Sequence, residues 1–131
     1  MNGARRINIS EMRWHIRALC KEAHLRRRWC KRNAYILFDC KGPTGAITLY
    51  LPPIRGQREY AIALHELGHF FGRYQLPRYS VGLSEVGAWV WARENALIWT
   101  RAMRETAIRS LGTYMTPTVR RRFVREELGK A

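Results

Sequence analysis

Apolar residues recur at helical spacing near the start of the chain. Ser10 is a suitable N-cap, and the residues behind it that would share one helix face are Met12, Ile16, Leu19 and Ala23. This pattern predicts an amphipathic helix that runs from Ser10 to about Arg28 and buries one face.

Two short β-rich segments follow, at residues 34–40 ("AYILFDC") and 46–52 ("AITLYLP"). The "KGPTG" between them combines Gly-Pro with a second glycine, which favours a turn between antiparallel strands. Pro52 and Pro53 end the second strand, because proline has no N–H group to donate to a neighbouring strand. We therefore expect a β-hairpin here.

A helix is predicted next, from about Gln57 to Phe71, with the apolar residues Tyr60, Leu64 and Leu67 and the terminal Phe71 along one face. Gly72 follows it and tolerates the left-handed conformation of a helix C-cap.

Two further helices complete the expected order. Ser84 is a suitable cap for a long helix over residues 85–110, which would end near Gly112. Thr116 before Pro117 predicts the start of a last helix. The order is α-β-β-α-α-α, so we predict a single compact α+β domain over residues 1–131.

Composition supports a folded chain. Of the 131 residues, 47% are hydrophobic and five are tryptophan, which argues against disorder. No apolar run approaches the roughly 20 residues that span a bilayer, and no secretion signal is visible at the N-terminus. We therefore expect a cytoplasmic protein without a membrane partner.

Charge adds a second clue to function. The chain carries 24 Lys and Arg against 10 Asp and Glu, a formal net charge of +14. Such a chain is attracted to polyanions, which makes nonspecific nucleic-acid binding through the basic surface one hypothesis. The alternative is that these side chains are solvated helix faces.

Three cysteines, at positions 20, 30 and 40, are an odd number and form no C-x-x-C pair. This usage indicates reduced thiols rather than a disulfide framework. A small zinc site formed by these three cysteines and His24 is an alternative, although the spacing of the four residues matches no familiar pattern.

The candidate chemistry lies in "HELGH", residues 65–69. His65 and His69 would project from the same helix face, one turn apart, where two imidazoles can hold one zinc ion. Glu66 would then act as a general base on a zinc-bound water, as in H-E-x-x-H metallopeptidases. The alternative is a buried helix that contains two histidines.

A third metal ligand must come from elsewhere. No histidine follows His69, and position 75, where a third metzincin histidine would stand, is Gln75. Glu85 is the preferred candidate, because the small residues Ala88, Ala92 and Ala96 on its helix face would let two helices pack closely. Glu94 is the second candidate. Glu85 could instead be an acid favoured by the helix dipole.

With H65-E66-L67-G68-H69 and the later E85-x-x-A88, the chain resembles the gluzincin branch of zinc metallopeptidases. The closest likeness is to the small ImmA/IrrE-type proteins, over about residues 35–100. The resemblance implies His65, His69 and Glu85 as Zn²⁺ ligands and Glu66 as catalytic base. It also implies a strand edge for an extended peptide. Members of that family act on transcriptional repressors in mobile elements and stress responses, so a phage or mobile-element setting is one hypothesis.

These expectations define two functional hypotheses. The first is zinc-dependent hydrolysis of a protein or peptide substrate, with Tyr74 and Tyr79 as candidate donors to the oxyanion. The substrate could be associated with nucleic acid. The second is a basic protein that binds nucleic acid or a partner and holds a structural or relic zinc ion. The presence of Glu66, which a structural zinc site does not need, favours the first hypothesis, that of an enzyme.

Overall fold

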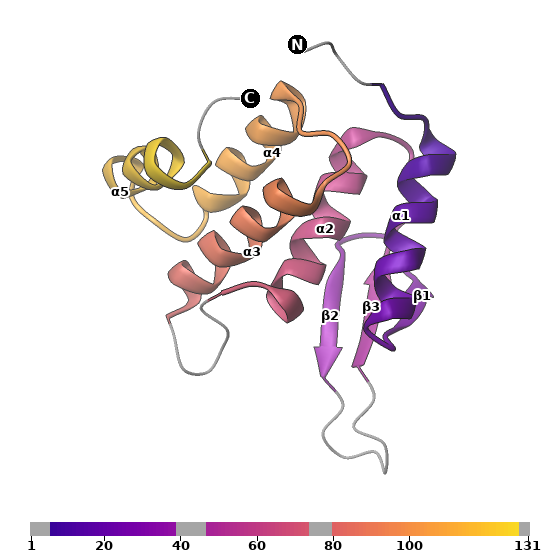
Figure 1. Ribbon diagram of the computed structural model, residues 1–131. Coiled ribbons are helices and arrows are strands. Elements are labelled where there is room, and N and C mark those ends of the chain that lie inside the picture. The colour runs from indigo at the N-terminus through magenta and orange to yellow at the C-terminus, as the bar shows by residue number, and fades with distance from the viewer. Residues whose placement is uncertain (1–5, 39–46, 74–79, 129–131) are drawn as a thin grey trace.

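The computed structural model describes residues 6–38, 47–73 and 80–128, and it has an α+β fold (Figure 1). In chain order, the described elements are α1 (Ile9–Glu22), β1 (Arg26–Trp29), β2 (Tyr35–Phe38), β3 (Ile47–Leu51), α2 (Gln57–Phe71), α3 (Val81–Asn95), α4 (Arg101–Leu111), α5 (Pro117–Phe123) and a π-helical turn, η1 (Val124–Leu128). In these ranges, no helix has the length and apolar character needed to cross a membrane.

Helix α1 begins and ends earlier than its apolar pattern predicts. Asn8, not Ser10, is the N-cap, because its side chain and that of Glu11 bond reciprocally to each other's backbone N–H groups in a capping box. The predicted end at Arg28 is also wrong, since the helix stops at Glu22 and His24 takes a positive φ of 56°. The predicted buried face is present and includes fully buried Ile16.

The arginines predicted to close the first helix form a strand instead. Residues Arg26–Trp29 pair in parallel with β3, in a register that places Arg27 beside Leu49 and Trp29 beside Leu51. All four side chains of β1 are exposed. The strand is therefore held by backbone hydrogen bonds to β3, a long-range pairing that helical periodicity does not reveal.

The sheet has the order β1-β3-β2, with β2 antiparallel to β3. The antiparallel pairing predicted for residues 34–40 and 46–52 is confirmed, whereas their predicted turn lies outside the described residues. Tyr35 stacks on its cross-strand partner Tyr50, with ring centroids 4.5 Å apart, a pair that stabilises the register. Both proline residues follow the end of β3, as expected.

Helix α2 occupies the middle of the molecule, between α1 with the sheet and the helices α3 to α5 (Figure 1). Its predicted bounds, Gln57–Phe71, are confirmed. Tyr60, Leu64 and Leu67 are fully buried, so the predicted apolar face is the core face. Gly72 is the C-cap but is extended rather than left-handed. Glycine is required there for another reason, because the carbonyl oxygens of Gly68 and Gly87 leave no room for a side chain.

The long helix predicted over residues 85–110 is two helices. Ser80, not Ser84, caps α3 by accepting a hydrogen bond from Leu83 N. Thr100 caps α4 and also donates a hydrogen bond of 2.6 Å to Gln57 Oε1 at the start of α2. Leu97 N, in the segment between the helices, donates to the Tyr60 hydroxyl. These contacts turn the chain back so that α4 packs on α2.

The end of the chain agrees with its capping signals. Gly112 ends α4, and Thr116 caps α5 with Pro117 in the first turn, as predicted. The segment continues into η1, which buries Val124 and Leu128 against the core.

Helices α2 and α3 approach each other unusually closely at Gly68. A Cβ atom built there would lie 2.8 Å from the Cα of Ala88 and closer still to its carbonyl oxygen. Ala88 and Ala92 are fully buried on the facing side of α3. The close helix packing predicted from the small residues on this face is therefore present at Ala88, where Gly68 supplies the facing surface, and it sets the separation of the two helices. Ala96 follows the end of α3.

We expect Gly68→Ala to lower the free energy of unfolding by about 2–4 kcal/mol, because the added methyl group meets backbone atoms that cannot move aside. Gly82→Ala is the matched control, since that helical glycine has open space around its Cβ position and the change should be neutral or slightly stabilising. Denaturant unfolding measures both. Equal effects of the two substitutions would contradict the close contact.

Candidate metal centre

His65, His69 and Glu85 converge at the interface of α2 and α3. Oε2 of Glu85 lies 2.9 Å from Nε2 of His65 and 2.7 Å from Nε2 of His69. The two Nε2 atoms are 3.2 Å apart. The fold thus brings together the three residues predicted as metal ligands, although Glu85 follows His69 by 16 positions in the sequence.

The surroundings of the cluster hold its side chains in place. His65 and Glu85 are buried, at 5% and 6% exposure. The ring of His65 stacks on Trp89 with centroids 4.2 Å apart. A hydrogen bond of 3.1 Å joins Nδ1 of His69 to Oγ of Ser84. A partner on the second ring nitrogen is typical of metal-binding histidines, because it sets the tautomer and the ring orientation.

The donor atoms fit a metal ion. Ligands held at about 2.0–2.1 Å around a tetrahedral ion lie roughly 3.3 Å from one another. The three separations between ligand atoms, 2.7, 2.9 and 3.2 Å, need only a small opening to reach that value. His65 differs from His69 at its second ring nitrogen, because Nδ1 of His65 has no hydrogen-bond partner among the described residues and its ring is held by stacking on Trp89. This buried group of two imidazoles and a carboxylate could therefore hold a metal ion.

Electrostatics favour the ligand forms of two of the three groups. Burial acts to raise the pKa of Glu85, but its contacts with His65 and His69 outweigh burial and hold that pKa well below its ordinary value. Burial lowers the pKa of His65, so its imidazole is neutral near pH 7. Burial also acts to lower the pKa of His69, but Glu85 and Glu66 outweigh it and raise that pKa. An ion that binds here would displace the His69 proton.

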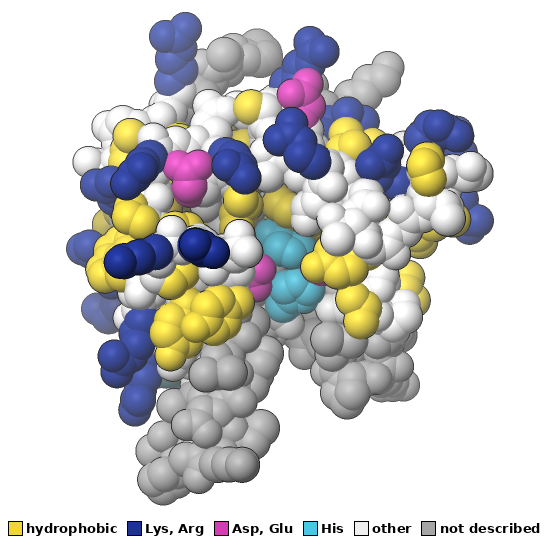
Figure 2. Space-filling model, turned by 180° about the vertical axis from the view of Figure 1, so that it is seen from behind, with side chains coloured by type: hydrophobic (Ala, Val, Ile, Leu, Met, Phe, Trp, Pro, Cys, Tyr) yellow, Lys and Arg dark blue, Asp and Glu magenta, His cyan; other side chains and the backbone are white. Residues whose placement is uncertain are grey.

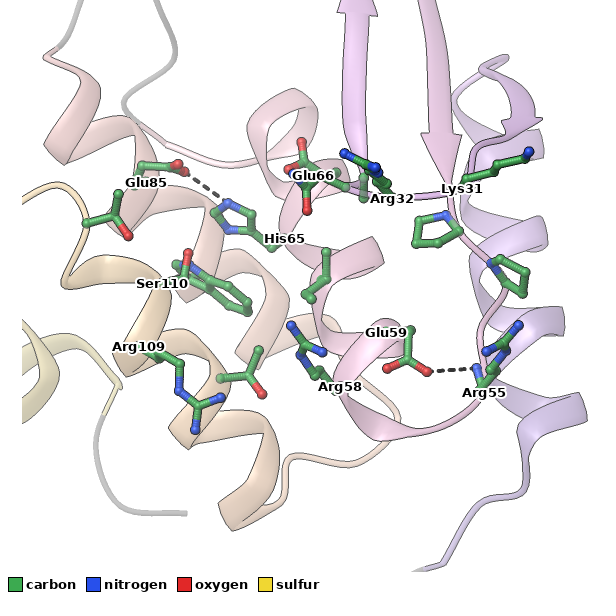
Figure 3. Close-up of a pocket in the computed structure, with 18 of the residues that line it drawn as sticks. Lys31, Arg32, Arg55, Arg58, Glu59, His65, Glu66, Glu85, Arg109 and Ser110 are labelled. Atoms are coloured by element: carbon green, nitrogen blue, oxygen red, sulfur yellow. Dashed lines mark hydrogen bonds and ion pairs between the residues drawn. The ribbon is translucent and has the colours of Figure 1, made fainter.

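Glu66 lies beside the cluster without belonging to it. Its carboxylate lines the same cleft as His65 and Glu85 (Figure 3). Burial is the main cause that raises the pKa of Glu66 to about 7, with Glu85 adding to the rise and His69 opposing it. A carboxylate with a pKa near neutrality is suited to accept and return a proton.

Tyr114 is a site residue that sequence reasoning missed. It follows α4, lines the cleft and hydrogen bonds to Glu85, an interaction that raises the pKa of Tyr114 to about 12. The residues predicted as phenol donors, Tyr74 and Tyr79, lie outside the described residues. No local motif surrounds Tyr114, because its place at the site depends on the chain reversal between α3 and α4.

Ser84 has a different role from the predicted one. It lies inside α3 rather than at its cap, and it contacts His69 instead. The sequence feature that could have indicated this contact is the position of Ser84 directly before Glu85. A residue next to one metal ligand in sequence lies near the metal site and can hydrogen bond to a second ligand.

The alternative metal ligands are not brought to this cluster. Glu94 is exposed near the end of α3. Cys20 is buried, and burial raises the pKa of its thiol to about 11. Cys40, a member of the alternative zinc site, lies outside the described residues. Within the described ranges, the only group of three metal-ligating side chains is that of His65, His69 and Glu85.

The cluster opens into a cleft of about 1000 Å³. Figure 2 shows the histidine side chains in a hollow, with hydrophobic and cationic side chains at its margins. The walls come from the segment between β1 and β2, the start and middle of α2, α3, and α4. The volume is sufficient for several residues of a peptide or for a small molecule.

A comparison of the chain with protein-family models, curated proteins and solved structures finds no match. The resemblance to gluzincin metallopeptidases therefore depends on the residues of the motif and on the geometry of the cluster.

We expect the purified protein to carry about one first-row transition-metal ion per chain, and Glu85→Ala to weaken its retention about a hundredfold or more, because a ligand is lost. Glu94→Ala, on the same helix but away from the cluster, is the matched control and should retain the ion. Elemental analysis after exposure to a mild chelator measures both. Equal metal loss from the two variants would contradict the assignment.

Proposed function

We propose that this protein is a zinc-dependent peptidase with a zincin-like fold of the gluzincin type. The observation that carries the proposal is the convergence of Glu85 with both histidines of "HELGH", while Glu66 faces the same cleft. Two imidazoles and one carboxylate are the ligand set of catalytic zinc sites, which keep a fourth position for water or substrate. Zinc, when bound, supplies Lewis acidity that activates water and polarises a carbonyl group.

Glu66 is assigned the proton transfers. Its carboxylate accepts a proton from the attacking water and returns it to the nitrogen of the leaving amine. Glu66 suits both steps because its carboxylate lines the same cleft as His65 and Glu85, next to the ligand group. Glu66 is adjacent to His65 but outside the ligand group, so it stays free for this role.

Tyr114 is assigned the stabilisation of the oxyanion. It lines the cleft together with Glu85, which raises the pKa of its phenol. The phenol stays protonated throughout the neutral range because its pKa is raised to about 12. It can therefore donate a hydrogen bond to the negative oxygen that develops during attack on a carbonyl.

The sheet supports an extended substrate. Strand β2 is at the edge of the sheet, and the segment that leads into it, with Asn33 and Ala34, lines the cleft. A peptide that added to this edge would approach the cluster in an extended conformation. Free cysteines at Cys20 and Cys30 are consistent with the proposal of a cytoplasmic protein.

A structural zinc site in a basic binding protein is the second candidate function. Structural zinc sites are closed by four protein ligands, whereas the ligand group found in the described ranges has three members. The cluster also faces a large cleft, which a structural site does not require. Both observations favour the peptidase, while the net charge of +14 is the feature that favours the binding protein.

We expect Glu66→Gln to lower kcat/KM for peptide cleavage by about 10²–10⁴-fold, because the amide cannot accept the proton from water. Its zinc content should equal that of the wild type, since Glu66 is not in the ligand group. A library of fluorogenic peptides with the zinc-loaded protein provides the activity, and elemental analysis provides the control. Undiminished cleavage in this variant would refute the mechanism, and no cleavage by the zinc-loaded wild type would refute the peptidase.

Tyr114→Phe should lower kcat about a hundredfold with little change in KM, because the hydroxyl acts on the transition state and not on the bound substrate. Tyr50→Phe, a half-buried tyrosine on the central strand β3 that does not line the cleft, is the matched control. Steady-state kinetics on the best library peptide distinguish the two. A change in KM alone would place Tyr114 in substrate binding instead.

A further inference from the structure

The wall of the cleft away from the metal cluster carries five cations that the mechanism does not use. They come from three parts of the fold, namely the β1–β2 segment, the start of α2 with the residues before it, and α4: Lys31, Arg32, Arg55, Arg58 and Arg109. All five side chains are exposed. Figure 3 shows them spread around the cavity, with Glu59 between Arg58 and Arg55 in this view. His65 and Glu85 lie on the other side of the cavity, and Glu66 is drawn next to Arg32.

These cations have no anionic partner among the described residues. The ion pairs found there are the contacts of Glu85 with the two histidines and two surface pairs on α4 and at the α5–η1 junction. Glu59, the acid nearest to them in sequence, accepts a hydrogen bond from the backbone N of Arg55. The cleft therefore presents unpaired guanidinium groups, which bind carboxylates through two parallel hydrogen bonds.

We propose that the cleft selects peptides with acidic side chains. The proposal depends on the peptidase function for cleavage, but not for binding. Since the five cations converge on the cavity that contains the metal cluster, an acidic segment can bind them while the bond to be cleaved lies at the cluster.

The distribution of charge favours a peptide over a nucleic acid. Glu66 and Glu85 make the metal end of the cleft acidic, whereas the rest of its wall carries five cations against one carboxylate, that of Glu59. A peptide can place uncharged residues at the acidic end and carboxylates at the cationic end. A nucleic acid carries a phosphate at every nucleotide and cannot avoid the acidic end.

The spacing of the site predicts where the acidic residue lies. Arg58 precedes His65 by seven residues on α2, about two helical turns, and both line the cleft. Two turns correspond to roughly 10 Å, and an extended peptide advances about 3.3 Å per residue. A carboxylate roughly three residues from the scissile bond would therefore reach Arg58.

The test is binding of a fluorescein-labelled peptide of alternating Glu and Ala to the Glu66→Gln protein, with and without zinc, at about 0.15 M salt. Fluorescence anisotropy gives the Kd. We expect this peptide to bind at least about tenfold more tightly than its Gln–Ala counterpart. Arg58→Glu with Arg109→Glu should weaken binding about tenfold or more, and the Gln double variant should weaken it less.

Arg121→Glu with Arg125→Glu is the matched control, because it changes the net charge equally on exposed residues that do not line the cleft. It should change the Kd less than twofold. Three results would overturn the proposal in favour of general polyanion binding. The first is an equal loss of affinity in the two Glu double variants, and the second is equal binding of the Gln–Ala peptide. The third is displacement of the acidic peptide by a single-stranded oligonucleotide that the two double variants weaken to the same extent.

Cleavage by the zinc-loaded wild type separates this proposal from the peptidase function. Binding of the acidic peptide in the cleft without cleavage of any peptide supports the acidic-peptide site and refutes the peptidase. Faster cleavage of peptides with a glutamate roughly three residues from the bond supports both. Equal cleavage of the Glu and Gln peptides overturns the selectivity and leaves the peptidase intact.

Discussion

The candidate site depends on one steric constraint, the contact of Gly68 on α2 with the backbone of Ala88 on α3. A side chain at position 68 would collide with that backbone and push the helices apart. Glu85 lies one turn before Ala88 on α3, and its carboxylate is 2.7–2.9 Å from both histidines of α2. A separation larger by even 1–2 Å would remove it from ligand distance of an ion bound to the histidines. A residue without a side chain is therefore part of the metal site.

The same contact creates an electrostatic problem that a metal ion would relieve. Glu85 and His65 are buried between the two helices, where a charged group loses most of its hydration. In the protein alone, the carboxylate is stabilised by its contacts with the two imidazoles. A divalent cation would hold the three ligand atoms with more favourable charge and would return the proton of His69 to solvent. Such a cluster is better explained by metal binding than by stability.

The cleft divides its charges according to the two tasks that we propose. Glu66 and Glu85 are at the metal cluster, where we propose that they move a proton and bind an ion, and the remaining walls carry five cations and the single carboxylate of Glu59. Part of the net charge of +14 is thus placed in the cleft, where it would attract an acidic ligand, besides the general attraction of the chain for polyanions. Trp89 is 1% exposed and packs on His65, so it presents no face on which a nucleic-acid base could stack.

The sequence alone determined the local features of this protein, and the tertiary structure decided which distant residues meet. The bounds of α2, the common face of His65 and His69, and the role of glycine and alanine in helix packing follow from periodicity and residue size, which act over one or two turns. The strand at Arg26–Trp29 and the break between α3 and α4 were predicted wrongly. Both depend on partners far along the chain, β3 in one case and Tyr60 with Gln57 in the other. Tertiary packing also decided three features of the site, because only the packed helices bring these side chains to the cluster. They are the choice of Glu85 over Glu94, the contact of Ser84 with His69 and the place of Tyr114 in the cleft.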